Sequence, residues 1–183
     1  MSDRLRQLEH YGVVTRAPNP AGRGFVYDLT EAGRELEGVC DALGAWGARW
    51  LELAPSHLDA DMVLWAMCRC MPREELPDPR LVVRFELTDG RPQRFWIVAQ
   101  PPAPEVCIKP PGFEEDLVVR SDSASLAKWQ LGWFSLGSAQ RHGLIAVEGP
   151  VHLQRTLAGW AGRHQFADIK PAPGAGKQMA APT

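Results

Sequence analysis

The stretch that decides the N-terminal fold is residues 4–39, RLRQLEHYGVVTRAPNPAGRGFVYDLTEAGRELEGV. Leucines three residues apart at its start predict a short amphipathic helix over Asp3–Tyr11. Ser2 can cap this helix at its N-terminus, and Gly12 suits its end, where a left-handed backbone conformation is favoured. The chain is therefore expected to open on a helix that ends abruptly.

Two β-rich runs follow this helix, at Val13–Thr15 and Phe25–Leu29. The residues between them are rich in Pro, Gly and Asn, which is typical of a connecting loop. The pattern predicts a two-stranded hairpin that carries Arg16 and Arg23 near its tip. Thr30 can cap the next helix, because its hydroxyl can accept a hydrogen bond from the first helical turn.

The order of these signals resembles the second half of the HxlR-type winged helix-turn-helix regulators, over about Ser2 to Trp50. The motif L-x-x-L-E-x-x-G-V-V, an arginine-bearing wing and the motif Y-x-L-T-x-x-G-x-x-L follow one another at the family's spacing. The resemblance implies DNA as a partner of this module. The DNA-contacting residues that it implies are Ser2, Arg4, Arg6, Arg16 and Arg23.

HxlR-type domains carry two or more helices ahead of the recognition helix, whereas Met1 here falls at that helix. A winged helix needs these elements to present its recognition helix to the major groove. The sequence as printed is therefore expected to bind DNA poorly. Two explanations stand: a start codon placed too far downstream, or a degenerate paralogue that keeps dimerisation and has lost DNA binding.

Composition sets bounds on function. The 183 residues are 45% apolar and carry a formal net charge of -2, and residues 1–50 have no excess of basic over acidic side chains, which weakens the DNA hypothesis for this chain. No apolar run has the length of a membrane span and no signal-peptide pattern opens the chain, so we expect a cytoplasmic protein. The four cysteines lack C-x-x-C spacing and are expected to be reduced thiols.

The helix after the hairpin carries apolar residues at alternating steps of three and four, which is a seam of heptad type. The residues of this seam that we expect at a homodimer interface are Leu36, Val39, Leu43, Trp46 and Trp50. In HxlR-type proteins the terminal helix helps to form the dimer. The alternative interpretation is that the seam packs on the C-terminal domain of the same chain.

The composition changes after residue 53, which ends a partial winged-helix module with its dimerisation helix (residues 1–53). We expect a linker at residues 54–58, a second domain at residues 59–166 and a disordered tail at residues 167–183. The second domain opens with a helix, and strand patterns follow at residues 81–87, 95–99, 105–109, 116–120 and 144–148. The fold class predicted is α+β: a partial winged helix (helix, β-hairpin, long helix) followed by an antiparallel five-stranded sheet covered by helices.

From about Asp59 to Trp160 the order of elements is similar to the sterol carrier protein fold, with V-R-F-E-L-T-D-G on the first hairpin and G-L-I-A-V-E-G-P-V-H-L before the last helix. The resemblance implies a tunnel for an apolar small molecule or lipid between the sheet and its helices. The ligand-binding residues expected are Phe85, Phe95, Trp129, Trp133, Phe134, Leu153 and Leu157. Sequence alone leaves a lined tunnel and a filled core as alternatives.

No catalytic constellation, metal-ligand pair or phosphate loop was found, and neither enzymatic activity nor a cofactor is expected. Two hypotheses remain. The first is an HxlR-type transcriptional regulator that is controlled by an apolar small-molecule ligand in its C-terminal domain, with DNA binding impaired in the chain as printed. The second is a lipid-binding or dimerisation module that does not bind DNA.

Overall fold

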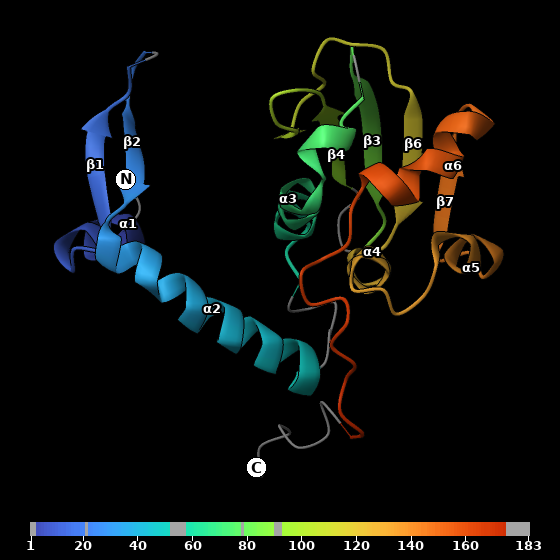
Figure 1. The fold of residues 1–183 in the computed structure, drawn as a ribbon. Helices are drawn as coiled ribbons and strands as arrows, with labels where there is room; N and C mark the ends of the chain where they lie inside the picture. The colour runs from blue at the N-terminus through green and yellow to red at the C-terminus, as the bar shows by residue number, and fades with distance from the viewer. Residues whose placement is uncertain (1–2, 21, 52–57, 78, 90–92, 175–183) are drawn as a thin grey trace. The chain divides into compact units, whose positions relative to one another are not determined.

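The structure is a computed structural model that describes residues 3–20, 22–51, 58–77, 79–89 and 93–174 (Figure 1). The chain divides into two compact units, Met1–Trp50 and Leu51–Thr183. Ser2 and most of the predicted linker lie outside the described residues, and residues 167–174 of the predicted tail form turns and irregular chain.

The N-terminal unit contains the predicted helix, hairpin and long helix. Its elements are α1 (Asp3–His10), β1 (Val14–Pro18), β2 (Phe25–Leu29) and α2 (Glu31–Trp50). The two strands pair antiparallel, with Val14 opposite Leu29 and Pro18 opposite Phe25. The predicted fold of these residues is confirmed.

Local chemistry explains where these elements begin and end. Gly12 follows α1 with a φ of 70°, in the left-handed region that favours glycine. The Thr30 hydroxyl accepts a hydrogen bond from the Gly33 amide at 3.0 Å, which confirms the predicted cap of α2. The same hydroxyl donates to the Gly12 carbonyl at 2.6 Å, so the start of α2 is tied to the end of α1.

The C-terminal unit consists of a sheet and the helices that cover one of its faces (Figure 1). Its helices are α3 (Ala60–Cys70), the 3-10 turn η2 (Arg73–Glu75), α4 (Ser123–Gln130), α5 (Leu136–Arg141) and α6 (Val151–Trp160). Its strands are β3 (Leu81–Leu87), β4 (Gln93–Ala99), β5 (Glu105–Cys107), β6 (Leu117–Ser121) and β7 (Ile145–Glu148).

The five strands lie in the order β5-β4-β3-β6-β7, and the sheet is mixed. The prediction of an antiparallel sheet was wrong at one pair, because β3 and β6 run parallel, with Val83 opposite Leu117. The chain leaves β5 at one edge and returns across the sheet to the end at which β3 starts. Such a crossover produces a parallel pair, whereas a tight hairpin would produce an antiparallel one.

The core lies between the sheet and its helices. Alternate residues of β3, from Leu81 to Leu87, face the helices and pack with Leu64 and Met67 of α3. Leu157 of α6 completes this layer from the other end of the chain. The alternation of apolar and polar residues read from the sequence thus fixes which face of β3 is buried.

The opposite face of the sheet carries a charged network. Glu86 of β3 pairs with Arg84, Arg94 and Arg120. Glu115 accepts hydrogen bonds from Arg84 Nε at 2.8 Å and from Trp96 Nε1 at 2.7 Å. The hydrogen bond from Arg120 and the neighbouring guanidinium groups hold the pKa of Glu86 below its usual value.

Candidate functional site

The hairpin is fixed against α2 by a close backbone approach at Gly33. A Cβ atom built on Gly33 would lie 2.1 Å from the Val13 carbonyl oxygen, so this position has room only for glycine. The Thr30 amide also donates to the Val13 carbonyl, at 3.1 Å. The wing therefore has a defined orientation relative to the first turn of α2.

The predicted DNA-contacting arginines lie on the surface of two elements. Arg4 and Arg6 are exposed on α1, where Arg6 pairs with Asp3. Arg16 is exposed on β1 with its guanidinium carbon 3.4 Å from the centre of the Phe25 ring, and Arg23 is exposed in the loop before β2. The structure thus places two arginines on the helix and two on the wing.

The predicted seam lies exposed along α2. Its members are Leu36, Val39, Leu43, Trp46 and Trp50, with exposures between 40% for Trp50 and 66% for Leu43. Leu8 of α1 and Phe25 of β2 are exposed as well. Exposed apolar side chains in such a row are typical of an interaction surface.

The predicted ligand-binding residues divide into two groups. Phe85, Phe95, Trp129 and Leu157 belong to the buried core, whereas Phe134 and Leu153 are partly buried beside it and Trp133 is exposed. None of the seven lines the cavity beside Asp59 and Ser123 or the cavity beside Trp65 and Arg69. Their role in ligand binding remains a prediction.

Two buried polar atoms lie among these core residues without a hydrogen-bond partner in the described part of the chain, namely Gln130 Oε1 and Trp160 Nε1. Gln130 Nε2 donates to the carbonyls of Ala161 and Gly162, at 3.2 and 3.3 Å, which fixes the amide orientation. One atom is an acceptor and the other a donor, and leaving either unpaired is costly.

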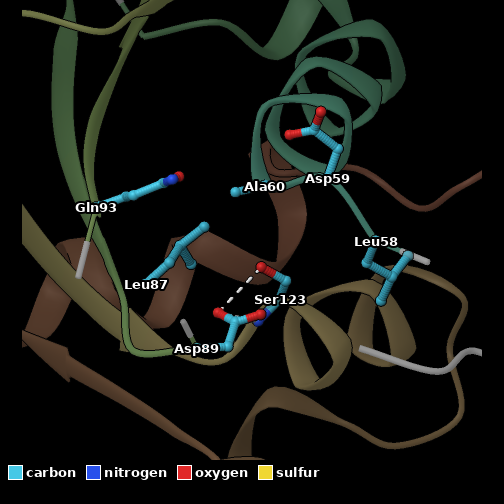
Figure 2. A pocket seen from close by; sticks show the side chains of 7 residues that line it. All are labelled: Leu58, Asp59, Ala60, Leu87, Asp89, Gln93 and Ser123. Carbon is cyan, nitrogen blue, oxygen red and sulfur yellow. Dashed lines mark hydrogen bonds between the residues drawn. The ribbon is translucent and has the colours of Figure 1, made fainter. Parts of the chain in front are cut away.

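The first cavity has a volume of about 370 Å³ and lies where the first turns of α3 and α4 meet the ends of β3 and β4 (Figure 2). Its residues are Leu58, Asp59, Ala60, Leu87, Asp89, Gln93 and Ser123. Both carboxylates already have structural roles. Asp59 caps α3, and Asp89 accepts from the amide and the hydroxyl of Ser123 at 3.0 and 3.1 Å.

The second cavity has a volume of about 560 Å³ and lies between α3, η2 and residues 103–106, which include the start of β5. Its residues are Trp65, Cys68, Arg69, Met71, Arg73, Ala103, Pro104, Glu105 and Val106. None of them was predicted as a site residue. The sequence holds a partial signal, because Trp65 and Arg69 stand four residues apart, as residues on one side of a helix do. Arg73 lies beyond the end of α3, in η2.

The cysteines do not form a reactive centre. Burial raises the pKa of Cys68 to about 12, so its side chain is a neutral thiol at physiological pH. Burial also raises the pKa values of Cys70 and Cys107.

Within the described ranges no three His, Cys, Asp or Glu side chains are grouped as a metal site would require. No helix in those ranges is long and apolar enough to cross a membrane.

The N-terminal unit has the elements of a winged helix, and residues 1–55 match the protein family described as HxlR-like helix-turn-helix. The predicted resemblance is confirmed for this part of the chain. One relative is the "Uncharacterized HTH-type transcriptional regulator YtcD" of Bacillus subtilis (strain 168), which is 45% identical over 49 residues. That match covers 26% of this chain and 39% of YtcD.

Solved structures similar to this chain include the sec-alkylsulfatase Pisa1 from Pseudomonas sp., at 12% identity and a TM-score of 0.51. This match covers 59% of the chain but 17% of Pisa1, and it concerns the fold alone. Sterol carrier protein 2 from Aedes aegypti, solved in complex with palmitate, matches at 14% identity and a TM-score of 0.40, over 57% of this chain and 94% of its own. Sterol carrier protein 2 from Yarrowia lipolytica matches at 13% identity and a TM-score of 0.38, over 58% and 75%.

Proposed function

We propose that this chain is a transcriptional regulator that binds DNA through α1 and the wing and responds to an apolar small molecule in its C-terminal unit. The observation that carries the proposal is the family match of residues 1–55 together with the arginine-bearing hairpin. In winged-helix proteins, phosphate contacts fix the register of the domain on DNA and base contacts give sequence preference.

The proposal includes a homodimer in the cytoplasm. The exposed seam of α2 supports it, because pairing two copies along this helix would remove five large apolar side chains from water. A two-fold dimer would present two copies of α1 to successive half-sites of an operator.

Ligand control is the finer part of the proposal. Trp129 and Leu157 lie in the same core as the unpaired Trp160 indole, so an apolar ligand with one polar group would suit this region. Ligand binding that changed the dimer geometry would couple the two units, with a typical coupling free energy of about 1–3 kcal/mol.

The DNA affinity of the chain as printed is expected to be low, because α1 has no buried residues and leaves Leu8 exposed. A recognition helix that is not held in place loses orientation on DNA. The test is a gel-shift titration of this chain and of a chain lengthened at its N-terminus by helices of the kind that precede the recognition helix in HxlR-type domains. Operator binding by the lengthened chain that weakens as salt increases supports the proposal, and no binding by either chain rejects it.

Arg23→Ala in the lengthened chain refines the test. Arg23 lies in the loop of the wing, so its loss should reduce affinity without changing the preferred sequence, as expected for a phosphate contact. A changed sequence preference would contradict this role.

The second candidate is a lipid-binding or dimerisation module without DNA binding. The observation that favours it is the charge of the N-terminal unit, which lacks the basic excess typical of DNA-binding domains. In that case the chain would bind an apolar probe and form dimers, while the lengthened chain would show no salt-sensitive DNA binding.

A further inference from the structure

Residues 161–169, here called the strap, follow α6 and contact the ends of two other helices. The His164 amide donates to the Gln130 carbonyl at 3.0 Å. The Gln130 side chain donates in turn to the carbonyls of Ala161 and Gly162. Gln130 is the last residue of α4 and is 4% exposed. Hydrogen bonds in both directions therefore fix the strap to the end of α4.

The same segment lies against the end of α3. A Cβ atom built on Gly162 would lie 2.0 Å from the Cys70 carbonyl oxygen, and the φ of Gly162 is 69°, so glycine alone suits this position. The Cys70 thiol also accepts a hydrogen bond from the Gln165 backbone. The strap thus contacts the last turns of both α3 and α4.

One histidine stabilises the bend of the strap. His164 Nδ1 lies 3.2 Å from the Phe166 amide nitrogen, and the centres of the two rings are 5.1 Å apart. The amide can only donate, so Nδ1 must accept, and it can accept only while it carries no proton. His142 shows the opposite case, because its Nδ1 lies 2.8 Å from the Ser138 carbonyl oxygen and must donate. Protonation would therefore break the contact of His164 and preserve that of His142.

The surroundings of His164 favour its neutral form. The side chain is partly buried, and its removal from water lowers its pKa below the ordinary value of 6.5. The titratable and charged groups of the elements that meet here are Arg69 and Cys70 at the end of α3, Lys128 near the end of α4, and Arg163 and Asp168 of the strap. Asp168 is the one carboxylate in this set, and it pairs with Arg163 at 3.6 Å.

Two buried polar atoms reduce the cost of releasing the strap. Gln130 Oε1 and Trp160 Nε1 have no hydrogen-bond partner in the described part of the chain, and the two residues are 4% and 5% exposed. An unpaired buried polar atom is costly, and water could bind both atoms once the strap moved away. The closed strap is therefore nearer to release than one with every polar atom paired.

We propose that the strap is a pH-sensitive switch, closed while His164 Nδ1 accepts from the Phe166 amide and released when His164 takes up a proton. The sign follows from proton linkage. The closed form holds the imidazole neutral more strongly than the open form does, so opening takes up a proton and the closed form loses stability as pH falls below 6.5. The inference depends on neither DNA binding nor ligand binding.

Hydrogen exchange of the full chain tests this switch, with rates corrected for intrinsic exchange at each pH. Peptides that cover residues 161–169 should exchange up to about tenfold faster at about pH 5.5 than at about pH 7.5, because uptake of one proton changes the opening equilibrium by at most about tenfold per pH unit. Peptides of β7 should keep a constant corrected rate. A constant rate in the strap, or an equal rise in β7, would overturn the proposal.

Two matched substitutions separate the titration of His164 from the fold. His164→Asn places an oxygen near the position of Nδ1, and this oxygen can accept from the Phe166 amide at any pH, as in an Asx turn. The acceleration by acid should therefore disappear. His142→Asn is the control and should keep the acceleration, because His142 lies at the end of α5, outside the strap. Acceleration retained in His164→Asn, or lost in His142→Asn, would overturn the proposal.

A direct titration needs no substitution. The His164 imidazole of the unaltered chain can be followed by NMR, and its pKa should lie below 6.5, in the pH range over which exchange of the strap accelerates. A measured pKa of 6.5 or above would overturn the proposal, whatever the variants show.

Discussion

The two units of this chain differ in how much of their apolar surface they bury. In the N-terminal unit, Val14 and Gly33 are the buried residues among those described, whereas the C-terminal unit encloses a continuous core between the sheet and its helices. An isolated two-stranded hairpin and a helix with an uncovered apolar face are marginal structures in water. From this contrast we predict that the first unit needs contacts beyond itself for stability, whereas the second encloses a core of its own.

The largest expected effect comes from Phe85→Ala, which creates a cavity in the core of the C-terminal unit. Phe85 is 0% exposed, so the substitution should lower the free energy of unfolding of this unit by about 3–5 kcal/mol. Hydrogen exchange read from peptides of each unit would measure the loss. Phe25→Ala is the matched change in the N-terminal unit and should cost about 1 kcal/mol or less; a larger cost there would contradict the contrast between the units.

Leu43→Asp tests the proposed homodimer of the first unit. A charge placed in the apolar seam would be desolvated in both chains, so dimerisation should weaken about 100-fold or more. Sedimentation velocity over a concentration series would measure it. Ala45→Asp, which lies away from the seam on the same helix, should leave the dimer intact; identical sedimentation of the two variants would refute the role of the seam.

Gly33→Ala and Gly38→Ala should change stability in opposite directions. A Cβ at Gly33 would clash with the Val13 carbonyl, which should cost about 1–3 kcal/mol and loosen the hairpin. A Cβ at Gly38 meets nothing within 4 Å, so alanine should stabilise α2 by about 1 kcal/mol. Thermal unfolding of both variants would measure these two changes in stability. If both substitutions stabilised the chain, or both destabilised it, the close approach at Gly33 would be excluded.

The smallest effect is a pH dependence in the C-terminal unit. The pKa of Glu86 is lowered in the folded state, so its pairing stabilises the unit above the ordinary value of 4.5 and is lost as pH falls through the lower folded value. Glu86→Gln should therefore flatten the fall in stability below about pH 4.5. Glu35→Gln on α2 is the control, and a parallel acid profile for Glu86→Gln and the unaltered chain would contradict the assignment.

Local signals allowed much of the fold to be predicted. The Thr30 cap, the turn at Gly12 and the alternation along β3 each depend on neighbours in sequence, and the structure confirms them. The parallel pairing of β3 with β6 could not be predicted in the same way, because it depends on the path of the chain from Cys107 to Leu117 across the sheet.

The candidate sites show the same division. Arg16, Arg23 and the α2 seam follow from the hairpin and from helical periodicity, and the structure places them on the expected elements. The cleft around Arg69 and Glu105 depends on two segments that are distant in sequence and meet in the fold. The spacing of Trp65 and Arg69 on one side of α3 could be read from the sequence, whereas the approach of residues 103–106 could not, because it depends on the fold.

The Gly33 contact has a mechanical consequence. Since the hairpin is held against the first turn of α2, we expect the wing to follow this helix when the helix tilts. An α-helix of 20 residues is about 30 Å long, so a tilt of about 10° at its far end displaces the wing by roughly 5 Å. That displacement exceeds the spacing between successive phosphates projected on the axis of a DNA strand, about 3.4 Å. A small tilt of α2 would thus shift the wing by more than the spacing of phosphates along the DNA backbone that the wing is proposed to contact.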